Sequence, residues 1–294
     1  MTDSTAKTRR ATAIGGGAVA LWASLAVITT AAGPVPPFQM TAMAFGLAFA
    51  LALGVWLARG DDIRAHLRLP PVVWALGIGG LFGYHVCYFA ALALAPPVEA
   101  NLLNYLWPLL IVVFAGLLPG ERLTLWHLGG AVAGLAGCVV LIGGGGLAGF
   151  RMEFALGYAF AAAAAVIWAT YSVLSRRFGA VPTDAVGAFC GATALLACVA
   201  HLLFEITYVP RGGEWLAVLA LGLGPVGAAF FLWDVGMKKG DIKALGALSY
   251  ATPLLSTILL VLFGRAEPSL RLVLACLLIV GGAALASRDL WKRS

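Results

Sequence analysis

The sequence predicts an all-α polytopic membrane protein with ten transmembrane helices, arranged as two inverted five-helix repeats around a central cavity. Three observations predict this fold. The composition is 62% hydrophobic and 11% charged, whereas charged residues make up about a quarter of a soluble domain. Apolar stretches of the ~20 residues that a helix needs to cross a bilayer recur along the chain. Finally, the chain repeats itself at an offset of about 145 residues.

The repeat is clearest between residues 103–110, which read LNYLWPLL, and residues 248–255, which read LSYATPLL. Five of the eight positions are identical, and Pro108 aligns with Pro253. Because each copy holds an odd number of spans, the second copy starts from the opposite side of the membrane, which is a common plan of secondary transporters. The sequence therefore predicts two inverted repeats.

Two further echoes fix the boundary between the repeats. Trp22 aligns with Trp168 at an offset of 146, and residues 119–121 (PGE) align more weakly with residues 265–267 (RAE). We therefore assign residues 1–147 to the first repeat and residues 148–294 to the second.

The spans are taken in order as residues 11–32, 37–58, 72–94, 97–118, 124–143, 154–176, 183–204, 213–236, 244–263 and 269–287. Long unbroken apolar runs indicate helices and not the alternating strands of a barrel. The first run follows three cations and resembles a signal peptide, but its ~22 residues exceed an ordinary signal core. Its Trp22 also has a partner at Trp168 deep in the chain, so it is expected to be a span.

The distribution of Lys and Arg predicts the orientation of the ten spans. Of the 19 cationic residues, fifteen fall on one side of the membrane and four on the other, which places both termini in the cytoplasm. The formal net charge of +6 and the pI near 9.2 follow from this bias. We therefore expect contact with the lipid bilayer and no nucleic-acid partner.

Several classes of protein are excluded by missing motifs. The sequence contains no GxxxxGK[ST] phosphate loop, HExxH or GxSxG motif, and no stretch fits a soluble domain, so we expect neither an enzyme nor an ATP-driven pump. The five cysteines lie within predicted spans and outside CxxC pairs, so no disulfide, metal site or cofactor is expected. An intramembrane enzyme, a receptor and an assembly factor remain minor alternatives.

Polar and aromatic residues at helical spacing predict where a substrate binds. Asn101, Asn104, Tyr105 and Pro108 share one face of the fourth span, and prolines bend helices and free carbonyls toward a cavity. Such residues also join helices by hydrogen bonds, which is the alternative explanation. We expect Pro108 and Pro253 to act as hinges and the following residues to bind substrate: Tyr84, His85, Tyr88, Asn101, Tyr105, Trp107, Trp168 and Tyr250.

The charged residues limit the chemistry of this site. Glu99 and Asp234 are the acidic residues nearest the apolar interior, and each lies within a turn of a predicted helix end. Apart from Tyr and Cys, His85 is the only ionisable side chain near the centre of a predicted span. We expect its ring to be neutral and hydrogen-bonded. A cavity with aromatic rings and no fixed charge suits a substrate that is apolar, or zwitterionic with an apolar side chain.

These motifs also carry a resemblance. The Trp-containing first span of each repeat, the two prolines and residues 119–122 (PGER) resemble the drug/metabolite transporter superfamily, EamA type, over essentially the whole chain. Residues 83–110, GYHVCYFAALALAPPVEANLLNYLWPLL, resemble most the bacterial aromatic amino-acid exporters of the YddG type. The resemblance implies a central cavity enclosed by spans 1, 3, 4, 6, 8 and 9.

We therefore expect a multi-pass transporter of the bacterial inner membrane that exports aromatic and other neutral amino acids by facilitated alternating access. The sequence leaves the oligomeric state open, a monomer included. The alternative is a proton-coupled efflux pump for hydrophobic drugs or other metabolites. In that case Glu99, Asp234 or His85 would have to carry protons.

Overall fold

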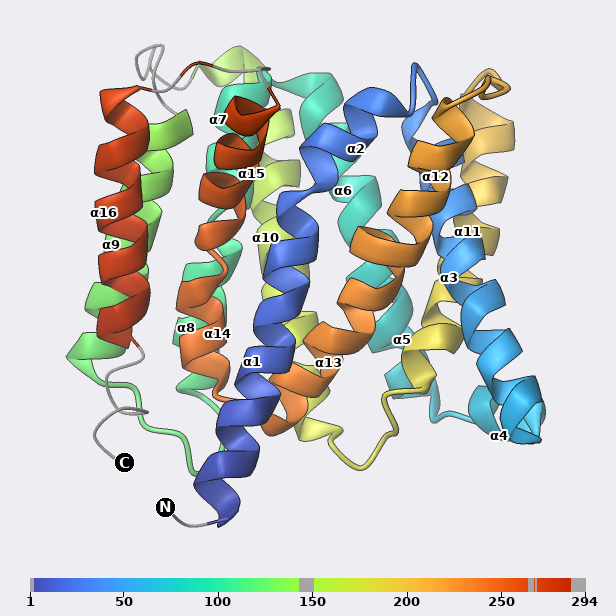
Figure 1. Cartoon of the computed structure of the whole chain (residues 1–294), viewed down its shortest axis with the longest axis horizontal. Helices are drawn as coiled ribbons and strands as arrows, with labels where there is room; N and C mark the ends of the chain where they lie inside the picture. The colour runs from blue at the N-terminus through green and yellow to red at the C-terminus, as the bar shows by residue number, and fades with distance from the viewer. Residues whose placement is uncertain (1–2, 143–150, 264–266, 268, 287–294) are drawn as a thin grey trace.

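The computed structural model describes residues 3–142, 151–263, 267 and 269–286, and every regular element in these residues is a helix, as predicted. The helices stand side by side in one bundle (Figure 1). Their bounds in the first half are α1 Asp3–Ala23, α2 Leu25–Ala31, α3 Pro37–Arg59, α4 Ile63–Leu67, α5 Pro71–Ile78, α6 Tyr84–Leu94, α7 Pro97–Asn104, α8 Trp107–Ala115 and α9 Leu125–Ile142. In the second half they are α10 Ala155–Arg177, α11 Ala185–Phe204, α12 Glu214–Leu223, α13 Ala229–Lys239, α14 Ile242–Leu248, α15 Ala251–Leu262 and α16 Leu270–Ala286.

Each predicted span coincides with an apolar helical segment of the described chain. Seven segments are long and apolar enough to cross a membrane: Thr5–Ala31, Pro37–Arg59, Pro71–Leu94, Met152–Arg177, Ala185–Phe204, Glu214–Lys239 and Ile242–Leu262. Three shorter apolar segments fall on the fourth, fifth and tenth predicted spans: Glu99–Ala115, Leu125–Leu141 and Leu270–Ala286. Of the weak third echo, Arg265 and Ala266 lie outside the described residues.

The helix irregularities recur at the offset of the sequence repeat. A π-helical turn at Gly79–Gly83 joins α5 to α6, and another at Gly224–Ala228 joins α12 to α13, 145 residues later. The fourth segment breaks between α7 and α8, and the ninth breaks between α14 and α15. Each break comes just before an aligned proline, Pro108 or Pro253, which lacks the N–H that would continue the helix. The two halves therefore share local geometry as well as sequence.

Local signals explain where several helices begin and end. Proline occupies the first position of α3, α5 and α7, where its missing N–H leaves no bond unmade. The Asp62 carboxylate caps α4, and the Asp241 carboxylate caps α14 by accepting from the N–H groups of Lys243 and Ala244. Gly60 ends α3 with φ of 74°, a conformation that favours glycine.

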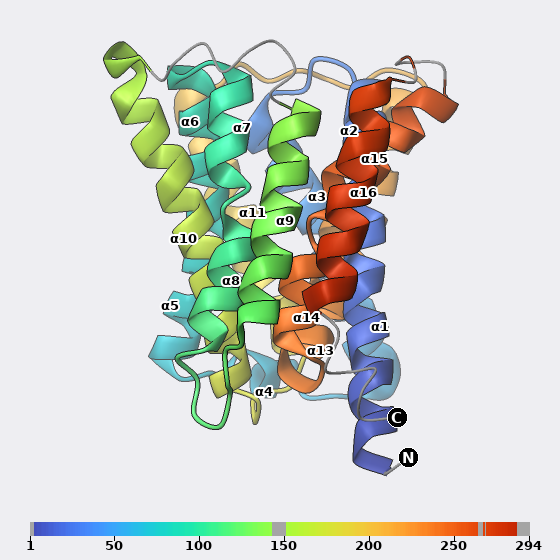
Figure 2. The ribbon, with the colours of Figure 1, turned by 90° about the vertical axis from the view of Figure 1, so that its left-hand side faces the viewer.

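Helices from the two halves pack in reciprocal pairs. Helix α1 packs along α13, and α10, the counterpart of α1, packs along α6, the counterpart of α13. Helices α3 and α11, and α9 and α16, pack with their own counterparts. Figure 1 shows α1 and α10 running in opposite directions, and Figure 2 shows α9 beside α16. This exchange of partners is what a two-fold relation between the halves produces.

The contact between α9 and α16 depends on glycine, and we expect Gly282→Val to destabilise the protein. A Cβ on Gly282 would clash with the backbone carbonyl of Gly130, whereas a Cβ on neighbouring Gly281 would meet nothing within 4 Å. Overpacking of this kind costs about 1–3 kcal/mol, so the thermal unfolding midpoint in detergent should fall by several degrees. Gly281→Val is the matched control. Equal midpoints for the two variants would contradict the prediction.

Candidate functional site

A cavity of about 560 Å³ is lined by residues from both halves of the chain. Its wall includes Pro37 at the start of α3, Leu92 near the end of α6 and Ser256 in α15. The start of α3, the end of α6 and α15 lie toward the upper end of the bundle in Figure 1, away from the start of α1. We call this the far end, and the end where α1 begins the near end. Cavities of ~300–1,000 Å³ are typical of small-molecule sites. No Asp, Glu, Lys or Arg is among its described lining residues.

The floor of the cavity is a cluster of aromatic rings at the centre of the bundle. The Trp168 ring lies 5.7 Å from the Trp22 ring, 6.3 Å from Trp107 and 5.7 Å from Phe230, all edge to face. The Trp22 indole N–H donates to the Pro225 carbonyl at 3.0 Å, beside the π-helical turn before α13. Edge-to-face packing leaves ring faces and edges available to a further ring.

Seven of the eight predicted binding residues line this cavity. The Tyr88 hydroxyl donates to Asn101 Oδ1 at 2.7 Å, and the Asn104 amide donates to the Tyr84 hydroxyl at 3.2 Å. The rings of Tyr84 and Tyr88 stack 5.8 Å apart. The seven are Tyr84, His85, Tyr88, Asn101, Tyr105, Trp107 and Trp168.

His85 has one ring nitrogen committed to the backbone. Its Nδ1 lies 2.7 Å from the Leu81 carbonyl oxygen, which can only accept, so Nδ1 carries the proton. The ring also meets those of Phe45 and Tyr84 edge to face. The hydrogen bond that we expected for this histidine is therefore present.

Tyr250, the eighth predicted residue, lies elsewhere. It is completely buried in a separate apolar cluster of α9, α15 and α16 that includes Cys138 and Ile279, and it is not among the described lining residues of the cavity. A Cβ on Gly134 would clash with its ring, which shows how closely α9 approaches. The hinge candidates Pro108 and Pro253 are buried beside the two helix breaks.

Ion pairs close the near end of the bundle. Glu121, in the loop after α8, pairs with Lys243 of α14 at 2.8 Å and with Arg176 of α10 at 3.2 Å. Arg176 also donates to the carbonyl of Gly240 at 2.7 Å. We call Glu121, Arg176 and Lys243 the Glu121 cluster. It joins the first half of the chain to two helices of the second half.

Partial burial works to raise the pKa of Glu121, but the hydrogen bond and charge of Lys243 outweigh it, helped by the charges of Arg176 and His127. The net effect holds the pKa of Glu121 below its ordinary value. The carboxylate therefore stays ionised at neutral pH, and the cluster remains paired.

Comparison with known proteins identifies the family. The model of the EamA-like transporter family matches twice, over residues 12–143 and 155–288. This chain belongs to the EamA-like transporter family. The prediction that it is a transporter of this type, and not an enzyme, is confirmed, and it is therefore a multi-pass membrane protein.

Relatives of this EamA-like transporter are named as amino acid exporters. The "aromatic amino acid exporter YddG" of Ancylobacter novellus is 57% identical over 94% of this chain and 96% of its own length. The protein of the same name from Salmonella typhimurium is 26% identical over 85% of this chain and 87% of its own. A solved crystal structure that is 56% identical covers 96% of this chain and 98% of its own, with a TM-score of 0.91. The resemblance to the YddG type is therefore confirmed.

The acidic residues nearest the interior of this EamA-like transporter do not reach the cavity. Asp234 is 3% exposed and pairs with Lys238 at 2.8 Å, while the Thr183 hydroxyl donates to the same carboxylate at 2.7 Å. Glu99, in the first turn of α7, is not among the described lining residues. The charge of Asp234 is thus balanced within the protein.

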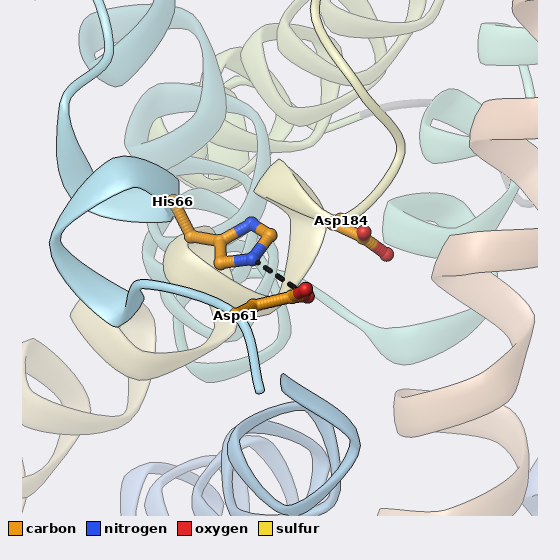
Figure 3. Close-up of side chains that lie close together, drawn as sticks. All are labelled: Asp61, His66 and Asp184. Atoms are coloured by element: carbon orange, nitrogen blue, oxygen red, sulfur yellow. Dashed lines mark hydrogen bonds and ion pairs between the residues drawn. The ribbon is translucent and has the colours of Figure 1, made fainter. Parts of the chain in front are cut away.

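A separate cluster brings together Asp61, His66 and Asp184, with donor atoms within 4.8 Å of one another (Figure 3). His66 Nε2 lies 3.1 Å from Asp61 Oδ2, and Asp184 pairs with Arg59 at 3.1 Å. Because Asp184 is already held by Arg59, two side chains remain, fewer than the three or four that hold zinc in proteins. We assign no metal to this cluster.

Two kinds of cavity residue in this EamA-like transporter were not predicted from the sequence. Phe45 and Phe230 line the cavity, but an apolar side chain in an apolar span carries no signal that would single it out. Thr252 also lines it, and here a signal existed, because Thr252 aligns with Trp107 in the repeat.

Proposed function

We propose that this EamA-like transporter exports aromatic and other neutral amino acids across a bacterial inner membrane by facilitated transport. The observation that carries the proposal is the 560 Å³ cavity. The packed rings of Trp22, Trp107, Trp168 and Phe230 form its floor, and no Asp, Glu, Lys or Arg is among its described lining residues. Such a wall suits an aromatic side chain and offers no side-chain counter-ion to a substrate with net charge. The names of the 57% and 26% identical relatives support the same substrate class.

The proposed architecture is ten spans in two inverted repeats, residues 1–147 and 148–294. The recurrence of π-helical turns and helix breaks, the reciprocal helix pairs and the opposite directions of α1 and α10 support it. The excess of Lys and Arg at the near end supports placing that end, and both termini, in the cytoplasm. The cavity then faces outward.

In the proposed cycle the two halves rock about the helix breaks at Pro108 and Pro253. Substrate enters from the cytoplasm when the Glu121 cluster has separated, and its ring settles among Tyr84, Trp107 and Trp168. When the cluster closes again, the substrate can leave only toward the outer side. No group on the substrate is altered, and because no ion or ATP hydrolysis is coupled in this cycle, transport runs down the gradient of the amino acid.

The test is flux of radiolabelled tryptophan, phenylalanine and threonine into liposomes that hold only the purified protein. We expect saturable tryptophan flux that phenylalanine inhibits and that an imposed pH gradient leaves unchanged. Protein-free liposomes give the background. Flux that requires a pH gradient, or that appears only with a hydrophobic drug, would favour the proton-coupled pump, in which Glu99, Asp234 or His85 would carry protons.

A further inference from the structure

Two polar atoms at the cavity have no partner within the protein. Five buried side-chain atoms of the described chain make no hydrogen bond, and two of them, Asn104 Oδ1 and Thr252 Oγ1, belong to residues that line the cavity. Asn104 is 4% exposed and Thr252 is 9% exposed. A buried polar atom without a partner costs about 1–3 kcal/mol, so a ligand that displaces the side chains covering these atoms and supplies the missing hydrogen bonds gains this energy.

The position of Asn104 favours a positively charged partner. It is the last residue of α7, so it lies at the negative end of that helix. Pro108, four residues on, has no N–H to bond to the backbone carbonyl of Asn104. A backbone carbonyl and a side-chain carbonyl therefore meet at one residue, and both only accept. An ammonium group, which only donates, is the matching chemistry.

The position of Thr252 favours a negatively charged partner. It is the second residue of α15, a twelve-residue helix, and so lies at the positive end of that helix. Its hydroxyl can donate a hydrogen bond, which a carboxylate accepts. In transporters with inverted repeats, helices interrupted at mid-membrane point their positive N-terminal ends at substrate carboxylates.

The two repeats contribute different side chains at these aligned positions, so the site distinguishes the two charged ends of a substrate. The repeat counterpart of Asn104 is Ser249, whose hydroxyl already donates to the Leu245 carbonyl at 2.7 Å. The counterpart of Thr252 is Trp107, part of the aromatic floor. At these positions each half therefore offers one buried polar atom without a partner, in Asn104 or Thr252, and the aligned residue of the other half offers none.

We propose that Asn104 accepts a hydrogen bond from the α-ammonium group of the substrate and that Thr252 donates one to its α-carboxylate, while the side chain lies against Trp107 and Trp168. This assignment rests on the proposed export of amino acids and identifies which residues recognise the part that all of them share. Aromatic and small neutral amino acids then use the same polar groups and differ only in how much of the aromatic floor they cover.

The test compares inhibition of tryptophan flux by tryptamine, which lacks the carboxylate, and by indole-3-propionate, which lacks the ammonium. Asn104→Leu should raise the KM for tryptophan and the inhibition constant of tryptamine about tenfold, and leave indole-3-propionate within twofold. Thr252→Val should do the reverse, affecting tryptophan and indole-3-propionate about tenfold and sparing tryptamine. Thr252→Ser should restore wild-type values.

Thr257→Val is the matched control, because its hydroxyl lies on the same helix, donates to the Pro253 carbonyl at 2.9 Å and does not belong to the described cavity lining. It should leave all three constants unchanged. Equal changes toward both analogues in the Asn104 and Thr252 variants, or no change, would overturn the assignment while tryptophan flux in the wild type stands. Absence of tryptophan flux in the wild type would instead overturn the proposed function.

Discussion

Replacing Glu121 with glutamine is expected to open the near end of the transporter. The change removes both ion pairs of the Glu121 cluster and leaves the buried cation of Lys243 and the partly buried cation of Arg176 without their carboxylate. The pairs are intermediate between exposed ones and fully buried ones, so their loss should cost the closed state about 2 kcal/mol, or roughly thirtyfold in the ratio of the two conformations. The near end should then open far more often.

Thiol labelling measures this shift in a background without the native cysteines. Ser175→Cys reports the near end, because Ser175 is 6% exposed beside Arg176, and Ser256→Cys reports the cavity. Glu121→Gln should raise labelling at position 175 by roughly thirtyfold and change labelling at position 256 by less than twofold. Arg59→Gln, which breaks an exposed ion pair, is the control and should change neither. Equal effects of the two variants would contradict a gate built on Glu121.

The far end has no matching ion pairs in the corresponding helices. Helix α7, the counterpart of α14, reads PVEANLLN, and α2, which corresponds to the end of α10, reads LAVITTA; neither carries Lys or Arg. Glu267, which aligns with Glu121, therefore lacks the helix cations that Glu121 uses. We therefore expect charge to hold the near end closed more strongly than the far end.

The pH dependence of the Glu121 cluster follows from its lowered pKa. Because the folded pKa lies below the ordinary value, the stabilisation is complete above that ordinary value and is lost as pH falls through the folded value. The ratio of labelling at position 175 to labelling at position 256, in which the ionisation of the thiols cancels, should therefore be low at neutral pH and rise as the pH falls below the ordinary pKa of a glutamate.

Replacing Trp168 with leucine is expected to reduce the preference for aromatic substrates. Trp168 is 5% exposed, lines the cavity and meets the rings of Trp22, Trp107 and Tyr84. An aromatic pair contributes about 0.5–1.5 kcal/mol beyond burial, so losing one or two contacts with the substrate should lower kcat/KM for tryptophan about tenfold relative to threonine. Flux of both amino acids into liposomes measures the ratio.

Trp233 provides the matched control. Its ring stacks 6.2 Å from that of Trp168 and is 1% exposed, but it is not among the described lining residues of the cavity. Trp233→Leu removes similar packing, so both variants should lose comparable thermal stability, and only Trp168→Leu should change the tryptophan-to-threonine ratio. A ratio that is unchanged in Trp168→Leu, or that falls equally in both, would contradict an aromatic binding wall.

Part of this protein was determined by its sequence alone. Long apolar runs predict helices because only hydrogen-bonded helices or closed barrels satisfy the backbone in lipid, and the runs of the described chain are all helical. The aligned prolines predicted the two helix breaks, since proline lacks the donor that continues a helix. Residues 83–110 also sufficed to indicate the family that the comparisons confirm.

Only the tertiary structure decided which faces meet. Tyr105 and Tyr250 occupy aligned positions, yet Tyr105 lines the cavity and Tyr250 is buried against α9 and α16. Helical periodicity shows which residues share a face, but the crossing of neighbouring helices determines what that face meets. The same holds for Glu121, whose partner Lys243 lies 122 positions away. Such pairs depend on the packing of the two halves, which no local pattern in either half specifies.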